Sequence, residues 1–469
     1  MAKPLQLFMR HENRNVAQKL TAFLNSDDLL CVIQGPPGVG KTKEAILWLL
    51  ETLLLQPHRT IAWIRLEQSR ISTYRIHLFR KHSELLDCIE HTMFRSAEVD
   101  LTSHLNCAGC DLVVLDNCNE SNKGPMNECT SDDIKTVAVS SLQMKLDMSF
   151  GPQDTYTVNG WTEAEFIDAC KNDAFYNSVK HNLQTDGFSS EDMDNPALRD
   201  DIILAKHHIA GASARWMFDV STDNLLASSS TAGSVEYHMS RAKYDHIVDG
   251  FTGDRSLTEV NHLLSRIDEK PVIVSRYVAT RLVEAHGEKL LQSALLLFGD
   301  SNPAMDGVLL EMDFILRLGR SKPEHTQQVM LVRAVNSEPE PVFPSGCKRI
   351  VFRYKTLPTD CCGVADGDWM VPRVFNNGGF DCVQYHEQSL NFVQVTRAAT
   401  HSFKLKWYEQ FRKAFIEAFP ALPVKKCAVY FVVPDTMVDT FKPQAANGTL
   451  GGYDGGYKVM GLRRVTVSA

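Results

Sequence analysis

A glycine-rich segment that ends in lysine and threonine carries the clearest chemical signal in the sequence. Residues 35–42 read Gly-Pro-Pro-Gly-Val-Gly-Lys-Thr and match Gly-x-x-x-x-Gly-Lys-Thr throughout. Glycines let the backbone turn its N–H groups towards phosphate oxygens, and the N-terminus of a following helix adds a favourable dipole. In this pattern the lysine reaches the β- and γ-phosphates and the threonine holds Mg²⁺. The sequence therefore predicts ATP and Mg²⁺ as cofactors, with ATP held by Gly35, Pro36, Pro37, Gly38, Val39, Gly40, Lys41 and Thr42.

The residues on either side supply the strand and the helix that such a loop requires. An apolar run at residues 29–33 precedes the loop, and apolar residues recur at helical spacing over residues 45–53. Strand, loop and helix in this order form the context in which the motif binds phosphate. The alternative is a glycine turn that only caps an ordinary helix.

A second apolar run in the sequence is followed by an acidic residue. Phosphate-binding sites of this kind are completed by a strand that ends in such a residue. Residues 112–115 are Leu-Val-Val-Leu, and Asp116 follows them. Because the carboxyl ends of parallel strands meet at one edge of a sheet, we expect Asp116 to hold the water shell of Mg²⁺ next to Thr42. Buried strands that end in aspartate are also common without this role.

The sequence leaves open which residue activates water. Asn117 follows Asp116, at a position where many ATPases of this broad type carry a glutamate. One alternative base is Glu67, at the end of a strand predicted over residues 60–67 and expected beside the first strand. The other is Glu120, and each of the two is otherwise a surface carboxylate.

Two further features are candidates for contact with the γ-phosphate. A predicted strand ends in Ser140 and Ser141, which sense this phosphate if the strand lies beside Asp116 and are otherwise turn residues. Arg215 follows a run of small residues, and as a lid arginine it would stabilise charge in the transition state. The alternative is that Arg215 stacks on Trp216 in a domain contact.

Length and composition indicate a protein of two or three domains. The chain has 469 residues, of which 44% are apolar and 23% charged, as in soluble globular proteins. No run approaches the roughly 18 apolar residues of a membrane span, and Met1 to Gln6 do not resemble the start of a signal peptide. Twelve irregularly spaced cysteines favour reduced thiols. Cys107 and Cys110 form a Cys-x-x-Cys pair that indicates either zinc or incidental thiols.

Charge is distributed unevenly along the chain. Residues 341–469 carry 16 Lys and Arg against 10 Asp and Glu, a net +6, whereas the whole chain carries −8. A polyanion such as DNA is therefore expected to meet the C-terminal third. The alternative is an ordinary solvated face.

Strands alternate with helices in the first part of the chain, which indicates an α/β fold with a parallel sheet. A helix is expected over residues 12–26, before the first strand. Thr162 and Glu165 form a capping box that starts another helix. Helices of a lid and connector are expected over residues 225–300, with a domain boundary near residues 297–303.

The chain resembles the NTPase part of Crinkler effectors of oomycetes and chytrid fungi, which are related to the retrotransposon hot spot proteins of trypanosomes. The likeness covers most of the chain. Its motifs are residues 35–42, the strand that ends at Asp116, Gly-Trp-Thr-Glu-Ala-Glu-Phe at 160–166 and Ala-Gly-Ala-Ser-Ala-Arg-Trp-Met-Phe at 210–218. The last of these is the most specific.

The resemblance implies a P-loop NTPase core over residues 1–155, a helical lid and connector over 156–298, and a restriction-endonuclease-like α/β domain over 299–469. In the NTPase, Lys41, Asp116 and Arg215 are the expected catalytic residues.

The nuclease-like domain implied by the resemblance has a metal-binding pattern of its own. The pattern is a helix glutamate, an aspartate that opens a strand, and acid-x-Lys on the next strand, with the acids binding Mg²⁺. Glu311 and Asp381 match the two acids as metal ligands, and Gln394 and Thr396 stand where the acid and the lysine are expected. Glu311, Asp381 and Gln394 are the predicted catalytic residues, and the alternative is a nuclease fold kept for binding or signalling.

The function implied is that of an ATP-binding and hydrolysing effector whose NTPase module controls a nuclease-like domain acting on DNA in the host nucleus. Cell death or altered immunity would follow, with host nuclear proteins as further partners. The alternatives are a nucleotide-operated switch that binds DNA or protein without cleaving, and a plain AAA-type remodeller. Secretion and host entry are expected from the resemblance, although this chain shows neither the family's secretion signal nor its Leu-Phe-Leu-Ala-Lys header.

Overall fold

A computed structural model divides the chain into two compact α/β units, each built from segments that are distant in the sequence. The first unit comprises Met1–Tyr176, Ala212–Asp219 and Ser240–Val274, and the second comprises Asn177–Gly211, Val220–Met239 and Ser275–Ala469. The three domains predicted from the resemblance stay a prediction. The structure describes residues 8–66, 73–82, 85–94, 101–119, 124–131, 134–141, 153–186, 188–227, 233–252, 258–267, 270–298, 303–319, 348–352, 357–372, 380–400, 405–444 and 448–462.

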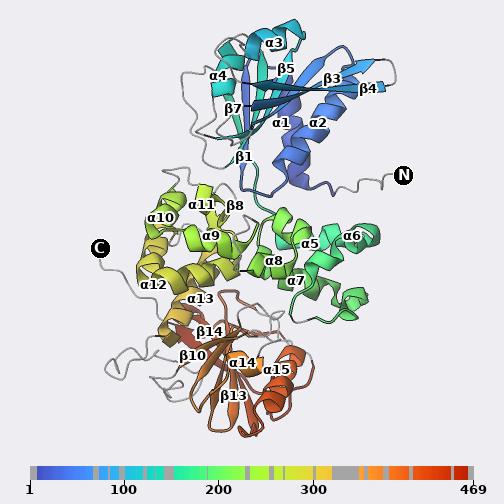
Figure 1. The fold of residues 1–469 in the computed structure, drawn as a ribbon. Helices are drawn as coiled ribbons and strands as arrows, with labels where there is room; N and C mark the ends of the chain where they lie inside the picture. Colours follow the sequence, from blue (N-terminus) through green and yellow to red (C-terminus); the bar gives the residue numbers. More distant parts are fainter. Residues whose placement is uncertain are drawn as a thin grey trace. The chain divides into compact units, whose positions relative to one another are not determined.

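A seven-stranded sheet with the order β4-β3-β2-β5-β6-β1-β7 forms the core of the first unit (Figure 1). The strands from β2 to β7 in this order are parallel, whereas β3 is antiparallel to both β2 and β4. The strands are β1 (Leu30–Gly35), β2 (Thr60–Leu66), β3 (Thr73–His82), β4 (Leu85–Phe94), β5 (Leu112–Cys118), β6 (Lys135–Ser141) and β7 (Gln153–Thr157).

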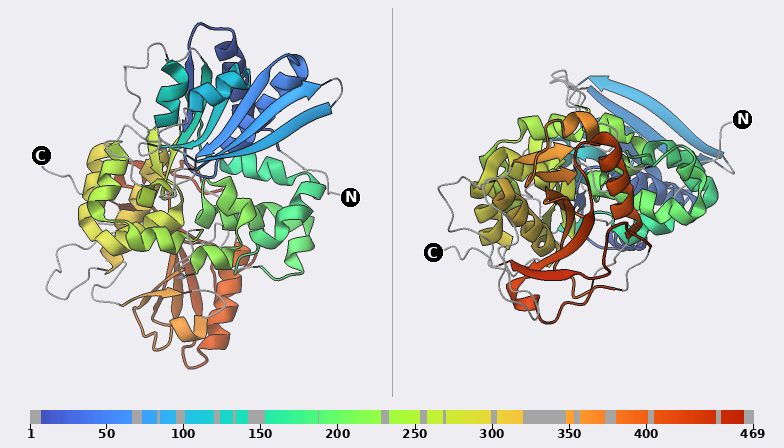
Figure 2. Two further views of the ribbon diagram at one scale, coloured as in Figure 1. Left: turned by 45° about the horizontal axis from the view of Figure 1, so that its top comes forward. Right: turned by 90° about the horizontal axis from the view of Figure 1, so that it is seen from below.

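Two predictions about this sheet are wrong. The sheet is mixed and not parallel, because a β3–β4 hairpin extends it beyond β2 (Figure 2). Its signal is the alternation of buried Ile76 and Leu78 with the more exposed Arg75 and His77. In addition, β2 does not lie beside β1, since β5 and β6 separate them. Glu67, which was expected near the first strand, lies outside the described residues.

Helices cover both faces of this sheet, and each face has its own apolar core (Figure 1). On one face Trp48 of α2 and Val16 of α1 pack with Ile33. On the other, Leu105 of α3 packs with the neighbouring strand residue Val32. Val32 and Ile33, which are successive residues of β1, thus pack on opposite faces of the sheet, as the pleat requires. The helices are α1 (His11–Leu24), α2 (Lys41–Leu55), α3 (Leu101–Cys107) and α4 (Gly124–Ser131).

Short helices and a hairpin complete the first unit. The predicted capping box at the start of α5 is confirmed, because the Thr162 hydroxyl accepts from the Glu165 N–H and the Glu165 carboxylate accepts from the Thr162 N–H. The elements are α5 (Glu163–Cys170), the π-helical turn η4 (Arg215–Asp219), α10 (Tyr244–Thr252), α11 (Thr258–Asn261), β8 (Leu264–Ile267) and β9 (Lys270–Ile273). Two helices, α6 (Asp173–Leu183) and α9 (Val235–Arg241), belong in part to each unit.

The second unit contains a six-stranded sheet with the order β10-β11-β12-β13-β14-β15. β12 is antiparallel to β11 and β13, and the other neighbours are parallel. The strands are β10 (Arg349–Phe352), β11 (Trp369–Pro372), β12 (Cys382–His386), β13 (Ser389–Val395), β14 (Lys426–Pro434) and β15 (Lys458–Leu462). The helices are α7 (Arg199–Ala210), α8 (Thr222–Leu226), α12 (Arg276–Phe298), α13 (Pro303–Gly319), α14 (Leu357–Asp360) and α15 (Leu405–Ala418), with short 3₁₀ turns at Asp192–Asp194, Pro196–Leu198 and Asp435–Met437.

Two long helices cover the two faces of this second sheet. Leu310 and Phe314 of α13 pack in one core with Val393. Phe392, the residue before Val393, stacks instead on Tyr408 of α15, which runs along the strands (Figure 1). Among the described residues, no helix is long and apolar enough to cross a membrane.

Candidate functional site

The predicted phosphate loop connects β1 to α2 at the carboxyl edge of the first sheet. Gly38 and Gly40 adopt φ values of 80° and 106°, which L side chains rarely take. Gly40 precedes the first residue of α2, so the loop turns directly into a helix N-terminus. The ammonium group of Lys41 folds back over the loop and donates to the carbonyl oxygens of Gly35 and Pro36, each at 2.7 Å.

Close contacts fix two of the glycines. A Cβ atom at position 35 would lie 2.6 Å from the carbonyl oxygen of Val158, and one at position 38 would lie 2.4 Å from Oγ of Ser213. A backbone carbonyl group and a serine side chain, both far away in the sequence, therefore leave no room for a side chain at these two positions. A side chain at either position would displace the loop or the segment that covers it.

The predicted metal pair lies together. The hydroxyl of Thr42 donates to Oδ1 of Asp116 at 2.8 Å, and Asp116 is 5% exposed. A hydroxyl and a carboxylate are hard oxygen donors of the kind that Mg²⁺ prefers, so these residues fit the ion that the motif implies. Thr42 lies in the first turn of α2, directly after the loop that follows β1, and Asp116 lies on β5, although β6 separates β1 from β5 in the sheet.

Arg215 lies against the same loop. Its backbone N–H donates to the carbonyl oxygen of Gly38 at 3.2 Å, and its side chain is exposed. The neighbouring Trp216 is buried, and its ring stacks on His262. The 212–219 segment, anchored by this indole, thus places a guanidinium beside the phosphate loop.

The charge of Arg215 acts on Lys41. Burial, and then the charge of Arg215, lowers the pKa of Lys41 to about 7, while Asp116 acts in the opposite direction. A positive group without enough nearby negative charge favours its neutral form. The loop is therefore a place where added negative charge would be stabilised.

The position after Asp116 is occupied by a structural residue. Asn117 has a φ of 68°, a conformation that asparagine tolerates, and it sits at a bulge between β5 and β6. Its side-chain amide donates to the carbonyl oxygen of Leu66 at 2.9 Å, which ties β5 to β2. Asn117 is therefore not a base, and the alternative Glu120 lies outside the described residues, as Glu67 does.

Ser140 meets the positional condition for a γ-phosphate sensor but not the chemical one. Its strand β6 pairs with β5, as that hypothesis required. However, the side chain is buried, and its hydroxyl donates to the carbonyl oxygen of Cys118 at 2.8 Å. The side chain of Ser141 lies outside the description.

The second unit brings three predicted residues into one cluster. Asp381 precedes β12, and its Oδ2 accepts hydrogen bonds from Nε2 of Gln394 at 2.8 Å and from the Val395 N–H at 2.5 Å. Glu311 on α13 is close enough that the charge of Asp381 raises its pKa. The helix glutamate, the strand aspartate and the hairpin glutamine therefore meet, although they are distant in the sequence.

Burial raises the pKa of both carboxyl groups in this cluster, and the charge of Arg276 opposes the rise in each. Arg276, the first residue of α12, approaches Glu311 with Nη1 to Oε2 at 3.7 Å. The sequence did not indicate this residue, because its distance from the acids along the chain gives no local pattern.

The donor set of the cluster fits a divalent cation. Two carboxylates are present, and Oε1 of Gln394 is a buried oxygen without a hydrogen-bond partner. Thr396 cannot replace the expected lysine, since a hydroxyl carries no positive charge, and here it accepts from the Ala398 N–H at 3.1 Å. The described residues contain no group of three or more His, Cys, Asp or Glu side chains placed to hold a metal, so this cluster has only two such ligands, and Cys107 and Cys110 belong to no such group.

Comparison with known proteins gives no family. No family model matches the chain, and no curated protein matches it. Among solved structures, a similar chain is a signal transduction ATPase with numerous domains and a tetratricopeptide-repeat sensor from Pyrococcus horikoshii, with 11% identity and a TM-score of 0.23. The match covers 67% of this chain and 49% of that protein, so the chain spans about half of its length. At this TM-score the likeness has no bearing on the function of the chain.

The lowered pKa of Lys41 predicts a pH dependence of nucleotide binding. Bound phosphate favours the charged amine, so above pH 7 binding must be accompanied by proton uptake. ATP affinity is expected to fall as the pH rises from 7 to 9, by up to about tenfold per unit. Titration calorimetry in two buffers of different ionisation enthalpy measures this uptake. The residual affinity of Lys41→Ala should show no such slope, and absence of proton uptake by the wild type at pH 8.5 contradicts the prediction.

Proposed function

We propose that the first unit binds and hydrolyses ATP with Mg²⁺. The observation that carries the proposal is the 2.8 Å hydrogen bond between Thr42 and Asp116, beside a lysine-bearing loop at a helix N-terminus. An ordinary glycine turn that caps a helix needs neither this carboxylate nor a second cation. The convergence of Lys41, Thr42, Asp116 and Arg215 supports nucleotide binding over that alternative.

Each residue has a distinct role in the proposed reaction. Loop N–H groups and Lys41 bind the β- and γ-phosphates, and Arg215 offsets the charge that develops on the γ-phosphate. Thr42 and Asp116 would hold Mg²⁺, which neutralises phosphate charge when bound. Asn117 ties β5 to β2 but accepts no proton, so hydrolysis is expected to be slow. The nucleotide-operated switch is therefore the second candidate.

Replacement of Lys41 by alanine tests this function. Loss of a charge-assisted phosphate contact should weaken ATP binding about 10- to 100-fold and depress turnover as well. The matched control is Lys43→Ala, which removes an exposed lysine from the same turn of α2. Binding is measured by calorimetry and turnover by phosphate release.

The outcomes separate three cases. Equal ATP binding by Lys41→Ala and wild type would refute the proposed site. Tight binding by the wild type with undetectable phosphate release selects the switch over the ATPase. Weakened binding in Lys43→Ala as well would mean that general positive charge on α2 matters, and not the motif.

We further propose that the second unit cleaves phosphodiester bonds of DNA with Mg²⁺ held by Glu311 and Asp381. The supporting observation is their meeting with the unpartnered oxygen of Gln394 in one buried cluster. The excess of basic residues in the C-terminal third supports a polyanionic substrate. Control of this unit by ATP, action in a host nucleus and contact with host nuclear proteins rest on the resemblance to Crinkler effectors and stay predictions.

Cleavage of supercoiled plasmid tests the second proposal. The purified full chain is incubated with Mg²⁺, with and without ATP, and nicking is followed on a gel. Asp381→Asn keeps the size of the side chain but removes the ligand charge, and it should abolish nicking. Asp439→Asn changes an exposed aspartate of the same unit and should nick as the wild type does. Nicking that survives Asp381→Asn excludes this cluster as the active site.

A further inference from the structure

Residues 158–162, here called the junction segment, join the phosphate loop to the rest of the first unit. The backbone N–H of Val158 donates to the carbonyl oxygen of Gln34 at 2.7 Å, directly before the loop. The N–H of Trp161 donates to the carbonyl oxygen of Ala212 at 3.0 Å, which leads into the segment that bears Arg215. The junction segment therefore touches both sides of the proposed nucleotide site.

The indole of Trp161 makes the most specific of these contacts. Its Nε1–H donates to the carbonyl oxygen of Val39 at 3.0 Å. Val39 lies between Gly38 and Gly40, where the backbone takes its two positive φ values. Indole is a donor only, so this contact selects a carbonyl oxygen and not an N–H at the outer side of the loop.

The orientation of that carbonyl matters for anion binding. A loop that binds phosphate with its N–H groups must direct its carbonyl oxygens away from the anion, because two negative partners repel. Trp161 holds the oxygen of Val39, and the N–H of Arg215 holds the oxygen of Gly38 at 3.2 Å. Two consecutive carbonyl groups are thus fixed by donors from outside the loop.

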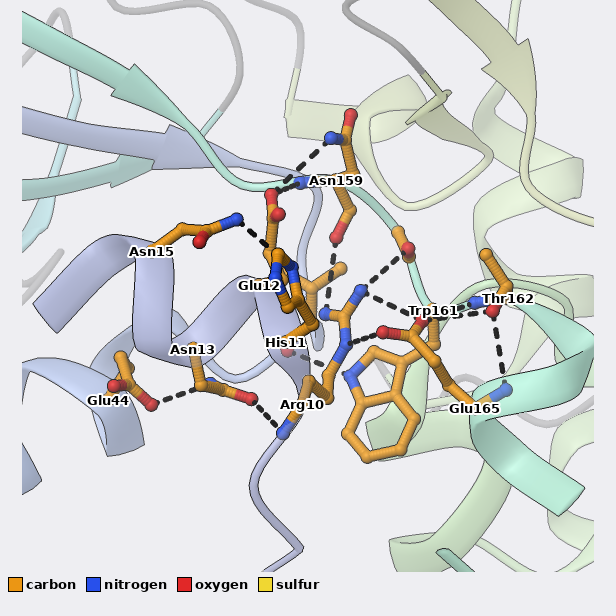
Figure 3. Close-up of polar contacts among 12 residues, drawn as sticks. Arg10, His11, Glu12, Asn13, Asn15, Glu44, Asn159, Trp161, Thr162 and Glu165 are labelled. Carbon is orange, nitrogen blue, oxygen red and sulfur yellow. Dashed lines mark hydrogen bonds and ion pairs between the residues drawn. The ribbon is translucent and has the colours of Figure 1, made fainter. Parts of the chain in front are cut away.

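Arg10 fixes the indole in turn (Figure 3). Its guanidinium carbon lies 4.9 Å from the centre of the Trp161 ring, and the residue is 3% exposed. It donates to the two carboxylate oxygens of Glu165 at 2.9 and 3.1 Å and to the carbonyl oxygen of Gly160 at 3.0 Å. Planar, bidentate geometry of this kind is specific to arginine. One side chain before α1 therefore clamps the start of α5 and the ring between them.

We propose that Trp161 is a positioning residue for phosphate binding, which holds the Val39 carbonyl away from bound phosphate, and that Arg10 orients its ring. The inference rests on the proposed nucleotide-binding function and adds two residues to it. In this proposal the Gly160-Trp161 part of the sequence motif has a role in the shape of the phosphate loop. Neither residue touches the nucleotide in this role.

Trp161→Phe tests the proposal with little risk to folding. Phenylalanine keeps an aromatic ring against Phe166, whose ring centre lies 5.0 Å from that of Trp161, but it removes the N–H donor. The full-length variant should bind ATP about three- to tenfold more weakly, the usual effect of losing one neutral hydrogen bond. The probe that isolates the loop is inorganic tripolyphosphate, for which the same loss is expected because the effect does not involve the base.

The controls distinguish positioning from general stability. Trp63→Phe alters a buried tryptophan in β2 of the same unit, and this variant should bind both probes as the wild type does. Arg10→Lys keeps the positive charge but loses the bidentate geometry of the guanidinium group. As a single substitution it should weaken tripolyphosphate binding, and combined with Trp161→Phe it should cause no further loss. Thermal unfolding without ligand is compared for all variants.

Two results would overturn the inference. The first is unchanged affinity of Trp161→Phe for both probes while Lys41→Ala loses binding, in which case the proposed function stands and the positioning role does not. The second is a loss of affinity in Trp161→Phe that Trp63→Phe shows equally, since a general packing defect then explains it. Failure of the wild type to bind either probe refutes the proposed function itself.

Discussion

The first unit depends on one constraint, which is that the positive charge of Lys41 is removed from water. The Lys41 ammonium group is held by two backbone carbonyl oxygens, with Arg215 as a second cation nearby. Burial of a charge without a paired counter-charge is unfavourable, and the lowered pKa of Lys41 records that cost. The loop is held from outside by the indole of Trp161 in the junction segment and by the backbone N–H of Arg215. In the proposed function a polyphosphate would supply the missing negative charge, so the cost of burying Lys41 and the preference for an anionic ligand would have the same origin.

The second unit also buries charged groups together, but there the groups are acidic. Glu311 and Asp381 are buried together, and burial raises the pKa of each. Arg276 reduces this effect from the start of α12, as Asp116 does for Lys41 in the first unit. Clusters of one charge sign in buried positions concentrate at functional sites, because a ligand of the opposite sign completes them. A polyphosphate fits the first cluster on these grounds, and a divalent cation fits the second.

Features that reside in contiguous residues could be predicted from the sequence, and features created by distant contacts could not. The phosphate loop, the strand before Asp116 and the capping box of α5 each have a local pattern, and the structure contains all three elements. The neighbours of β2 depend on how strands are ordered in space, which no local pattern records. The clamp of Arg10 on Glu165 joins residues separated by 155 positions, so neither residue alone indicates it. The β3–β4 hairpin is a different case, since its alternation was present in the sequence.

In both units the residues predicted to bind a ligand lie together, whereas the positions expected to move a proton hold other residue types. Lys41, Thr42 and Asp116 lie together, but Asn117 uses its amide to tie two strands. Glu311 and Asp381 lie together as well, but the hydroxyl of Thr396 is engaged by its own backbone neighbour. Binding depends on charge and shape, whereas fast turnover also needs a base of suitable pKa at the reacting atom. For the proposed ATPase this combination would favour occupancy over rate, because slow hydrolysis would prolong the nucleotide-bound state and let that state act as a signal.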